Sequence, residues 1–311
     1  MELLILSFLV IIIFLSGCGI NDESQQANFT PEEKDEALKF GYEITDQVLP
    51  GQVINMKITL TSQVKDNIDN IKLRVTDPYG LKLLSQNCVS AGGNDLPNCG
   101  FVSPLRCGCE FSQLEGFEDI ELNLIFKVPG SDEIARIGRE LEPEFTITYD
   151  YRGESKYRIP ILREGERTTT ADIEETQTKG PIHVEMERGF TSSNYNWERS
   201  GSQFSIVIRV RDVLTSKSNV EIDRDKFDIT LNSYLKKSPE PGVLCDFVIV
   251  GTNKYYNPKI NINLPMKTPI VCALEATNDQ VPWAYGEIKV NYNYTYKTVK
   301  TERIDVEIVI V

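Results

Sequence analysis

The chain has 311 residues, with 46 acidic against 33 basic side chains and a formal net charge of −13. Such an acidic balance repels phosphate backbones and anionic lipid headgroups, which argues against nucleic acid as a partner. The length is sufficient for two domains, each with its own core.

An apolar run opens the chain. From Leu3 to Leu15 only Ser7 is polar, and the run ends in Leu15-Ser16-Gly17-Cys18. It is shorter than the about 20 residues that a membrane span needs, and it matches the apolar part of a secretory signal. The last four residues resemble the lipobox of prokaryotic lipoproteins. The resemblance implies that residues 1–17 are a signal peptide and that a lipidated Cys18 anchors an exported chain to the membrane.

No Lys or Arg precedes the apolar run, so two alternatives stay open. One is an uncleaved N-terminal anchor, and the other is a pilin-like assembly helix. All three readings place the rest of the chain outside the cytoplasm. Residues 18–39 are polar and rich in Asn, Gln, Asp and Glu, which predicts a flexible tether.

From residue 40 onward, apolar side chains recur at every second position, as they do from Ile54 to Leu60. This alternation predicts half-buried antiparallel strands, and many short strands with turns between them predict a β-sandwich. Arg152-Gly153-Glu154 is predicted to be one such turn. Residues 164–181 are charged and Thr-rich without alternation, so we predict a linker there. It separates a domain at 40–163 from a second at 182–311.

A short internal repeat supports two copies of one fold, since the sequence FTITYDY at 145–151 aligns with IKVNYNY at 288–294. The whole pattern resembles prokaryotic, including archaeal, surface lipoproteins with immunoglobulin-like or fibronectin-type modules. The resemblance implies an all-β fold of two tandem Ig-like antiparallel β-sandwiches after the N-terminal hydrophobic segment. It carries no functional residues across.

Six cysteines remain besides Cys18, and an even number in an exported chain predicts disulfides. Cys245 and Cys272 occupy core-facing positions on different predicted strands, so we expect them to form a bridge. The other four are clustered, and two connectivities stay open: 88–107 with 99–109, or 88–109 with 99–107. The clustered residues are Cys88, Cys99, Cys107 and Cys109.

No catalytic or metal site is apparent. The one histidine, His183, is expected on the solvated face of a strand, and the chain has no nucleophile elbow, zinc-protease motif or phosphate loop. The densest acidic clusters, at 66–70 and 223–228, lack the spacing of a calcium-binding EF-hand loop. We therefore expect no enzyme, no cofactor and no metal.

Aromatic side chains in predicted loops are the candidate binding residues, because exposed aromatics form binding surfaces. They are Tyr195, Trp197, Tyr255, Tyr256 and Trp283. Asn28 and Asn293 begin acceptor patterns for N-linked glycosylation.

The expected function is a noncatalytic, lipid-anchored surface protein that binds or adheres to an unknown surface protein or glycan. The alternative is a structural adaptor, or a subunit of an envelope complex or surface filament, that binds through edge strands. An exported enzyme is the third hypothesis. An exposed aromatic cluster on the second domain favours the first hypothesis, and a long uncovered edge strand favours the second.

Overall fold

The computed structural model describes residues 33–44, 48–77, 80–90, 107–189, 196–214, 220–238, 245, 248–249, 254–256 and 262–307. Most of these residues lie in antiparallel strands, so the predicted all-β sandwich fold is confirmed. Within the described ranges, α2 (Ser131–Ile137) is the one α-helix. None of the helices described is long and apolar enough to cross a bilayer. Cys18 and Asn28 lie outside the described residues.

The first half of the chain contributes a four-stranded antiparallel sheet. Its strands, in spatial order, are β1 (Leu38–Ile44), β2 (Val53–Ser62), β6 (Asp119–Lys127) and β4 (Lys82–Ser90). The alternation predicted from Ile54 to Leu60 puts one face of β2 into the core, where those apolar side chains are fully buried. Phe40 of β1 has its ring centroid 5.4 Å from that of Phe145, which belongs to the facing sheet.

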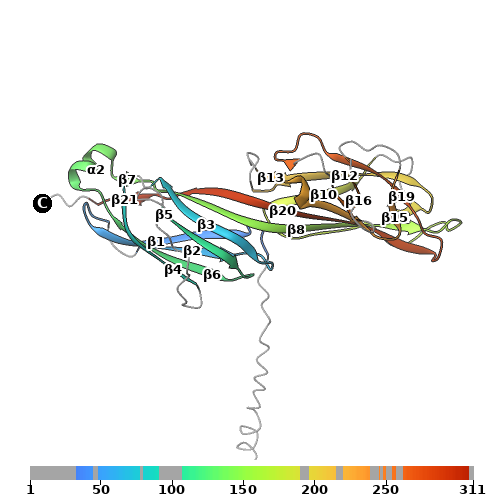
Figure 1. The fold of residues 1–311 in the computed structure, drawn as a ribbon, viewed down its shortest axis with the longest axis horizontal. Coiled ribbons are helices and arrows are strands. Elements are labelled where there is room, and N and C mark those ends of the chain that lie inside the picture. The colour runs from blue at the N-terminus through green and yellow to red at the C-terminus, as the bar shows by residue number, and fades with distance from the viewer. Residues whose placement is uncertain are drawn as a thin grey trace, which may run out of the picture. The chain divides into compact units, whose positions relative to one another are not determined.

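That facing sheet has nine strands and runs through both halves of the chain. Its main path is β16 (Val248–Ile249), β17 (Lys254–Tyr256), β14 (Phe227–Leu231), β20 (Trp283–Thr301), β8 (Glu144–Leu162), β3 (Ile68–Asp77) and β5 (Cys107–Leu114). The green β8 and the red β20 lie side by side in Figure 1 and pair without interruption from Trp283↔Leu162 to Thr301↔Glu144. Two short strands, β9 (Glu174–Gln177) and β11 (Glu198–Arg199), also pair with β8.

A second four-stranded sheet packs on the other part of the nine-stranded sheet. It consists of β10 (Ile182–Arg188), β12 (Gln203–Asp212), β19 (Ile270–Ala276) and β15 (Leu235–Lys237). The smaller elements are β13 (Glu221–Ile222) paired with β18 (Ile262–Asn263), β7 (Glu140–Leu141) paired with β21 (Ile304–Asp305), and the 3-10 turn η1 (Arg224–Lys226).

The chain does not turn at Arg152-Gly153-Glu154, so that prediction is wrong. β8 continues straight through these residues, and Gly153 lies opposite Tyr292 on β20. A Cβ at Gly153 would approach Cζ of Tyr292 to 2.2 Å. Glycine is therefore needed at position 153 because the ring of Tyr292 packs directly against its Cα, and this residue does not form a turn.

The predicted linker at 164–181 contains β9, which pairs with β8 from Arg158↔Glu174 to Ser155↔Gln177. The two sandwiches thus share one sheet, with β8 and β20 common to both. The repeated segments found in the sequence lie on these two strands and face each other, since Tyr151 pairs with Tyr294 and Tyr149 with Tyr296.

Residues 33–39 were predicted to end the flexible tether, and the structure instead packs them into the fold. Ala37 is fully buried. The backbone N–H of Lys65 donates to Oε1 of Glu33 at 2.9 Å, and the N–H of Lys34 donates to the carbonyl of Gln63 at 2.9 Å. Residues that precede the first strand therefore belong to the folded structure.

His183 was predicted to lie on a solvated strand face, and that prediction is wrong because the same segment covers the histidine. Its exposed fraction is only 7%. Its Nε2 lies 3.0 Å from Oδ1 of Asp35, and its Nδ1 lies 2.9 Å from Nε2 of Gln177. Lys179 approaches the same Asp35 oxygen at 3.5 Å. The polar face of β10 is thus covered by a segment far away in the sequence.

Buried tyrosines on β8 and β20 form hydrogen bonds with the chain segment that leads into β10 of the second four-stranded sheet. The hydroxyl of Tyr292 donates to the carbonyl of Ile182 at 3.0 Å, and that of Tyr151 donates to the carbonyl of Lys179 at 2.7 Å. Burial raises the pKa of Tyr292 to about 12. These side chains bury large rings and direct their hydroxyls onto the chain that leads into β10.

Candidate binding surface

Two of the predicted aromatic residues, Trp283 in β20 and Trp197 directly before β11, lie beside the same end of β8. On one side, Trp283 of β20 pairs with Leu162. On the other side, Glu198 of β11 pairs in parallel with Ile161. Neighbouring strands are about 4.8 Å apart, so the two flanking strands are roughly 10 Å apart across β8.

Strand alternation decides which way these side chains point. Glu198 is buried in the core together with Ile161, so Trp197 and Arg199 on either side of it face outward. Leu162 and its partner Trp283 lie on the same face as Arg199, where Leu162 is covered and only 1% exposed. Trp283 is 41% exposed. We call the outward group Trp197, Trp283, Tyr285, Arg158 and Arg199 the aromatic platform.

Ring contacts give the platform a defined geometry. Trp283 and Tyr285 meet edge to face, with centroids 5.3 Å apart and an interplanar angle of 88°. The guanidinium of Arg158 lies 4.2 Å from the centroid of Tyr285, and that of Arg199 lies 5.3 Å from the centroid of Trp197. Cation–π contacts at these distances are favourable and orient both partners.

Acidic neighbours hold the arginine and the tyrosine in place. Nη1 of Arg158 donates to Oε2 of Glu174 at 2.6 Å, and its Nε lies 3.6 Å from Oε2 of Glu287. The hydroxyl of Tyr285 donates to the other oxygen of Glu174 at 2.9 Å. Burial, together with this hydrogen bond, raises the pKa of Tyr285. The platform is thus fixed before any partner arrives, which reduces the entropy lost on binding.

A buried ion pair positions the two-residue strand β11. Nη2 of Arg188 lies 2.6 Å from Oε1 of Glu198, with side chains only 11% and 6% exposed. The hydroxyl of Ser202 donates to the other Glu198 oxygen at 2.9 Å. Burial raises the pKa of Glu198, and Arg188 offsets part of that shift. The residue between Trp197 and Arg199 is therefore anchored in the core.

Two of the remaining predicted aromatic residues lie on another strand of the nine-stranded sheet. Tyr255 and Tyr256 lie in the strand β17, so their assignment to a loop is wrong, as it is for Trp283 at the start of β20. Tyr195 lies outside the described residues. Sequence reasoning missed Tyr285, Arg158 and Arg199. Tyr285 and Arg199 each lie two residues after a tryptophan, so strand alternation could have placed them on the same face. Arg158 comes beside Tyr285 only through the pairing register of β8 and β20.

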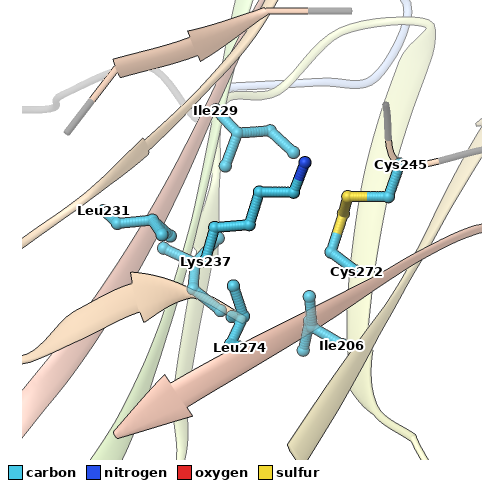
Figure 2. A pocket seen from close by; sticks show the side chains of 8 residues that line it. Ile206, Ile229, Leu231, Lys237, Cys245, Cys272 and Leu274 are labelled. Carbon is cyan, nitrogen blue, oxygen red and sulfur yellow. A yellow bond between two sulfur atoms is a disulfide. The ribbon is translucent and has the colours of Figure 1, made fainter. Parts of the chain in front are cut away.

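The second sandwich contains the predicted bridge between Cys245 and Cys272. Figure 2 shows the disulfide beside Ile206 and Ile229, with the side chain of Lys237 extended toward it from β15. These residues surround an apolar cavity of about 20 Å³, enough for about one water molecule. Among the residues described around it, this region is core packing about a disulfide.

The cysteine cluster of the first half is described only in part. Cys109 is buried and disulfide-bonded. Cys99 and the side chains of Cys88 and Cys107 lie outside the described part of the structure, so both predicted connectivities stay open.

The two acidic clusters are engaged with neighbouring side chains. In the first, Asp69 lies 3.9 Å from Nη2 of Arg152, and in the second Asp228 accepts a 2.9 Å hydrogen bond from Nδ2 of Asn291. Among the residues that the structure describes, no group of three or more histidine, cysteine or acidic side chains is arranged to hold a metal ion.

No protein-family model matches the chain, and no curated protein matches it either. Solved structures give distant similarities. The full-length major pilin SpaD from Corynebacterium diphtheriae aligns at 8% identity and a TM-score of 0.29, covering 80% of this chain and 56% of the pilin. A DUF4466 family protein from Parabacteroides merdae aligns at 9% identity and a TM-score of 0.21, covering 85% of this chain and 99% of that one.

A transglutaminase from red sea bream aligns at 8% identity and a TM-score of 0.23, covering 88% of this chain and 32% of the enzyme. The chain therefore spans about half the length of the pilin and about a third of the transglutaminase. Similarities this distant carry no function to the chain, so function has to be argued from its own residues.

Proposed function

We propose that the protein is an exported, lipid-anchored, noncatalytic binding protein that uses the aromatic platform to dock a protein partner at the cell envelope. The single observation that carries the proposal is the pre-ordered, partly exposed group of two tryptophans, a tyrosine and two arginines at one end of β8, of which Trp283 is the most exposed aromatic side chain. The anchor is the lipid on Cys18 that the lipobox resemblance implies.

The composition of the platform favours a protein over a glycan as the partner. Trp, Tyr and Arg are the residue types that contribute most of the binding energy in protein interfaces, typically at the centre of the contact. Here both guanidinium groups lie against aromatic rings, and Arg158 is also held by Glu174. One face of Tyr285 is thus already covered, which leaves less open ring surface for stacking against a sugar.

The structural-adaptor hypothesis stays as the second candidate, because the first half has an edge strand of useful length. Among the described residues, β1 pairs along one side only, with β2, over all seven of its residues. An edge of this kind is able to accept a strand from another chain. Binding there does not involve the platform, so the two candidates are separable by mutation.

The test is a crosslinking pull-down of the anchored protein from intact cells, read by mass spectrometry. Wild type is compared with Trp283→Ala and with Val299→Ala. Val299 is a matched control, since it is 47% exposed on the same strand β20 but at its opposite end. If Trp283 is a hot spot worth about 2 kcal/mol, affinity for the captured protein falls roughly 30-fold in Trp283→Ala.

Three outcomes are informative. Loss of a specific protein partner in Trp283→Ala but not in Val299→Ala supports the proposal. Capture of a fixed-ratio envelope protein that is unaffected by Trp283→Ala favours the adaptor reading through β1. Recovery of glycan alone overturns the choice of a protein partner. The same spectra report whether Cys18 carries a lipid.

A further inference from the structure

A polar groove lies over the middle of β8, away from the aromatic platform. On one side of β8, pairing with β3 ends at Asp150, and pairing with β9 begins at Ser155. Thr178, directly after β9, still donates its backbone N–H to the carbonyl of Glu154 at 2.8 Å. Residues 151–153 therefore have no strand neighbour on that side in the described structure. A solvent-open groove of about 700 Å³ is found there, within the size range of ligand pockets.

The groove has no aliphatic or aromatic side chain in its lining. Its walls come from the start of β3 and the connection before it, from β5, β8 and β20, and from Thr178 directly after β9. They present carboxylates, amides and a guanidinium, among them Asp66, Asn67, Gln113 and Arg152. This mixture of donors and acceptors suits a ligand made of hydroxyl groups, because each hydroxyl both donates and accepts.

Asn293 opens into this groove and begins the acceptor pattern Asn293-Tyr294-Thr295. Its side chain is exposed, while Tyr294 points into the core. The hydroxyl of Thr295 is on the same outward face and donates to Oδ1 of Asp150. The neighbouring Asn291 uses its amide on Asp228, but no hydrogen bond within the described structure engages the side chain of Asn293.

We propose that Asn293 carries an N-linked glycan whose first sugars lie in the polar groove. The donor is an oligosaccharide joined through pyrophosphate to a lipid carrier, and a separate transferase acts on the exported chain. The amide Nδ2 forms a bond to the anomeric carbon, the bond from that carbon to the pyrophosphate oxygen breaks, and one amide proton is lost. The lipid pyrophosphate is the leaving group.

The transfer precedes folding, because Asn293 lies in the middle of a strand that pairs with β8. Once β20 is in place, the attached glycan faces solvent above the gap in the sheet. The polar side chains of the groove then provide hydrogen bonds to the first sugars. Like the proposed function, this inference requires that the protein is exported. It does not depend on the aromatic platform.

The experiment is glycopeptide mass spectrometry on the full chain purified from its native host. We expect a glycan mass on the peptide that contains Asn293. Asn293→Gln and Thr295→Val remove it completely, while Thr295→Ser, which keeps the hydroxyl and the acceptor pattern, retains it. An unmodified Asn293 in the native protein overturns the proposal, including the case in which only Asn28 is modified.

A second measurement tests the position of the sugars. An amidase that releases N-linked glycans should act severalfold more slowly on Asn293 in the folded protein than after denaturation. Arg152→Ala, together with Gln113→Ala, should remove most of that protection, while Lys57→Ala on the other sheet should not change it. Equal release from folded and denatured protein contradicts the groove. The platform variant Trp283→Ala leaves the glycan unchanged, so failure here is distinguishable from failure of the binding proposal.

Discussion

Arg188→Met is predicted to destabilise the protein in a pH-dependent way, because it leaves Glu198 buried without its cation. The two side chains are only 11% and 6% exposed, and their charged atoms are 2.6 Å apart. Removing one partner of a buried ion pair typically costs about 3–5 kcal/mol. Methionine has a similar length, so the loss comes mainly from the unpaired carboxylate and less from a cavity.

The sign of the pH dependence follows from the pKa of Glu198, which burial raises in the folded state. A carboxyl with a raised folded pKa binds its proton more tightly when folded. Its contribution to stability therefore falls as the pH rises from below the unfolded pKa through the folded one. Arg188→Met removes the one cation that lowers this pKa, so the penalty extends to higher pH. The loss of stability should be large near pH 7 and smaller near about pH 5.

The assay is guanidinium-induced unfolding followed by tryptophan fluorescence. Both tryptophans flank this end of β8, so the signal reports on the region that is changed. The double variant Arg188→Met/Glu198→Gln should recover most of the loss, since the neutral amide carries no charge to bury. A loss below about 1 kcal/mol, as for a solvent-exposed pair, refutes the reasoning. An equal loss of unfolding free energy at pH 7 and at about pH 5 also refutes it.

Other substitutions test separate features. Cys245→Ser opens a loop with a sequence separation of 27 and should cost about 3–4 kcal/mol in oxidising buffer, so an unchanged melting temperature contradicts a stabilising bridge. Gly153→Ala should lower the free energy of unfolding by about 1–3 kcal/mol, because the new Cβ meets the ring of Tyr292. Gly41→Ala is the control and should not destabilise the protein, since its Cβ meets only the carbonyl oxygen of Thr59 at 3.9 Å. Burial raises the pKa of Tyr157 and Tyr292 to about 12, so stability should fall between about pH 10 and 12 by up to about 1.4 kcal/mol per pH unit for each tyrosine. A phenolate absorbance titration that matches free tyrosine in the folded protein would contradict this.

Local pattern was sufficient to predict the strands and the face that each one buries. From Ile54 to Leu60 the alternating side chains enter the core as expected, and Cys245 and Cys272 meet because both occupy inward positions. These predictions succeed because a strand has a period of two, so a few consecutive residues determine which side chains are buried.

The sequence was misleading where one residue had two structural explanations. Gly153 was predicted to form a turn, and it is needed instead for the close packing of Tyr292. His183 alternates with apolar residues as a surface position does, yet Asp35 covers it from far away in the chain. In each case the deciding partner is distant in sequence, and a local pattern carries no information about it.

The sequence by itself determined the all-β class, the inward faces, the bridge between Cys245 and Cys272, and the residue types able to form a binding surface. Only the tertiary structure decided that β8 and β20 join both sandwiches in one sheet, and that Trp197 and Trp283 flank the same end of β8. The physical reason is that alternation sets the direction of a side chain, whereas its neighbours depend on the pairing register between strands that are far apart in the chain.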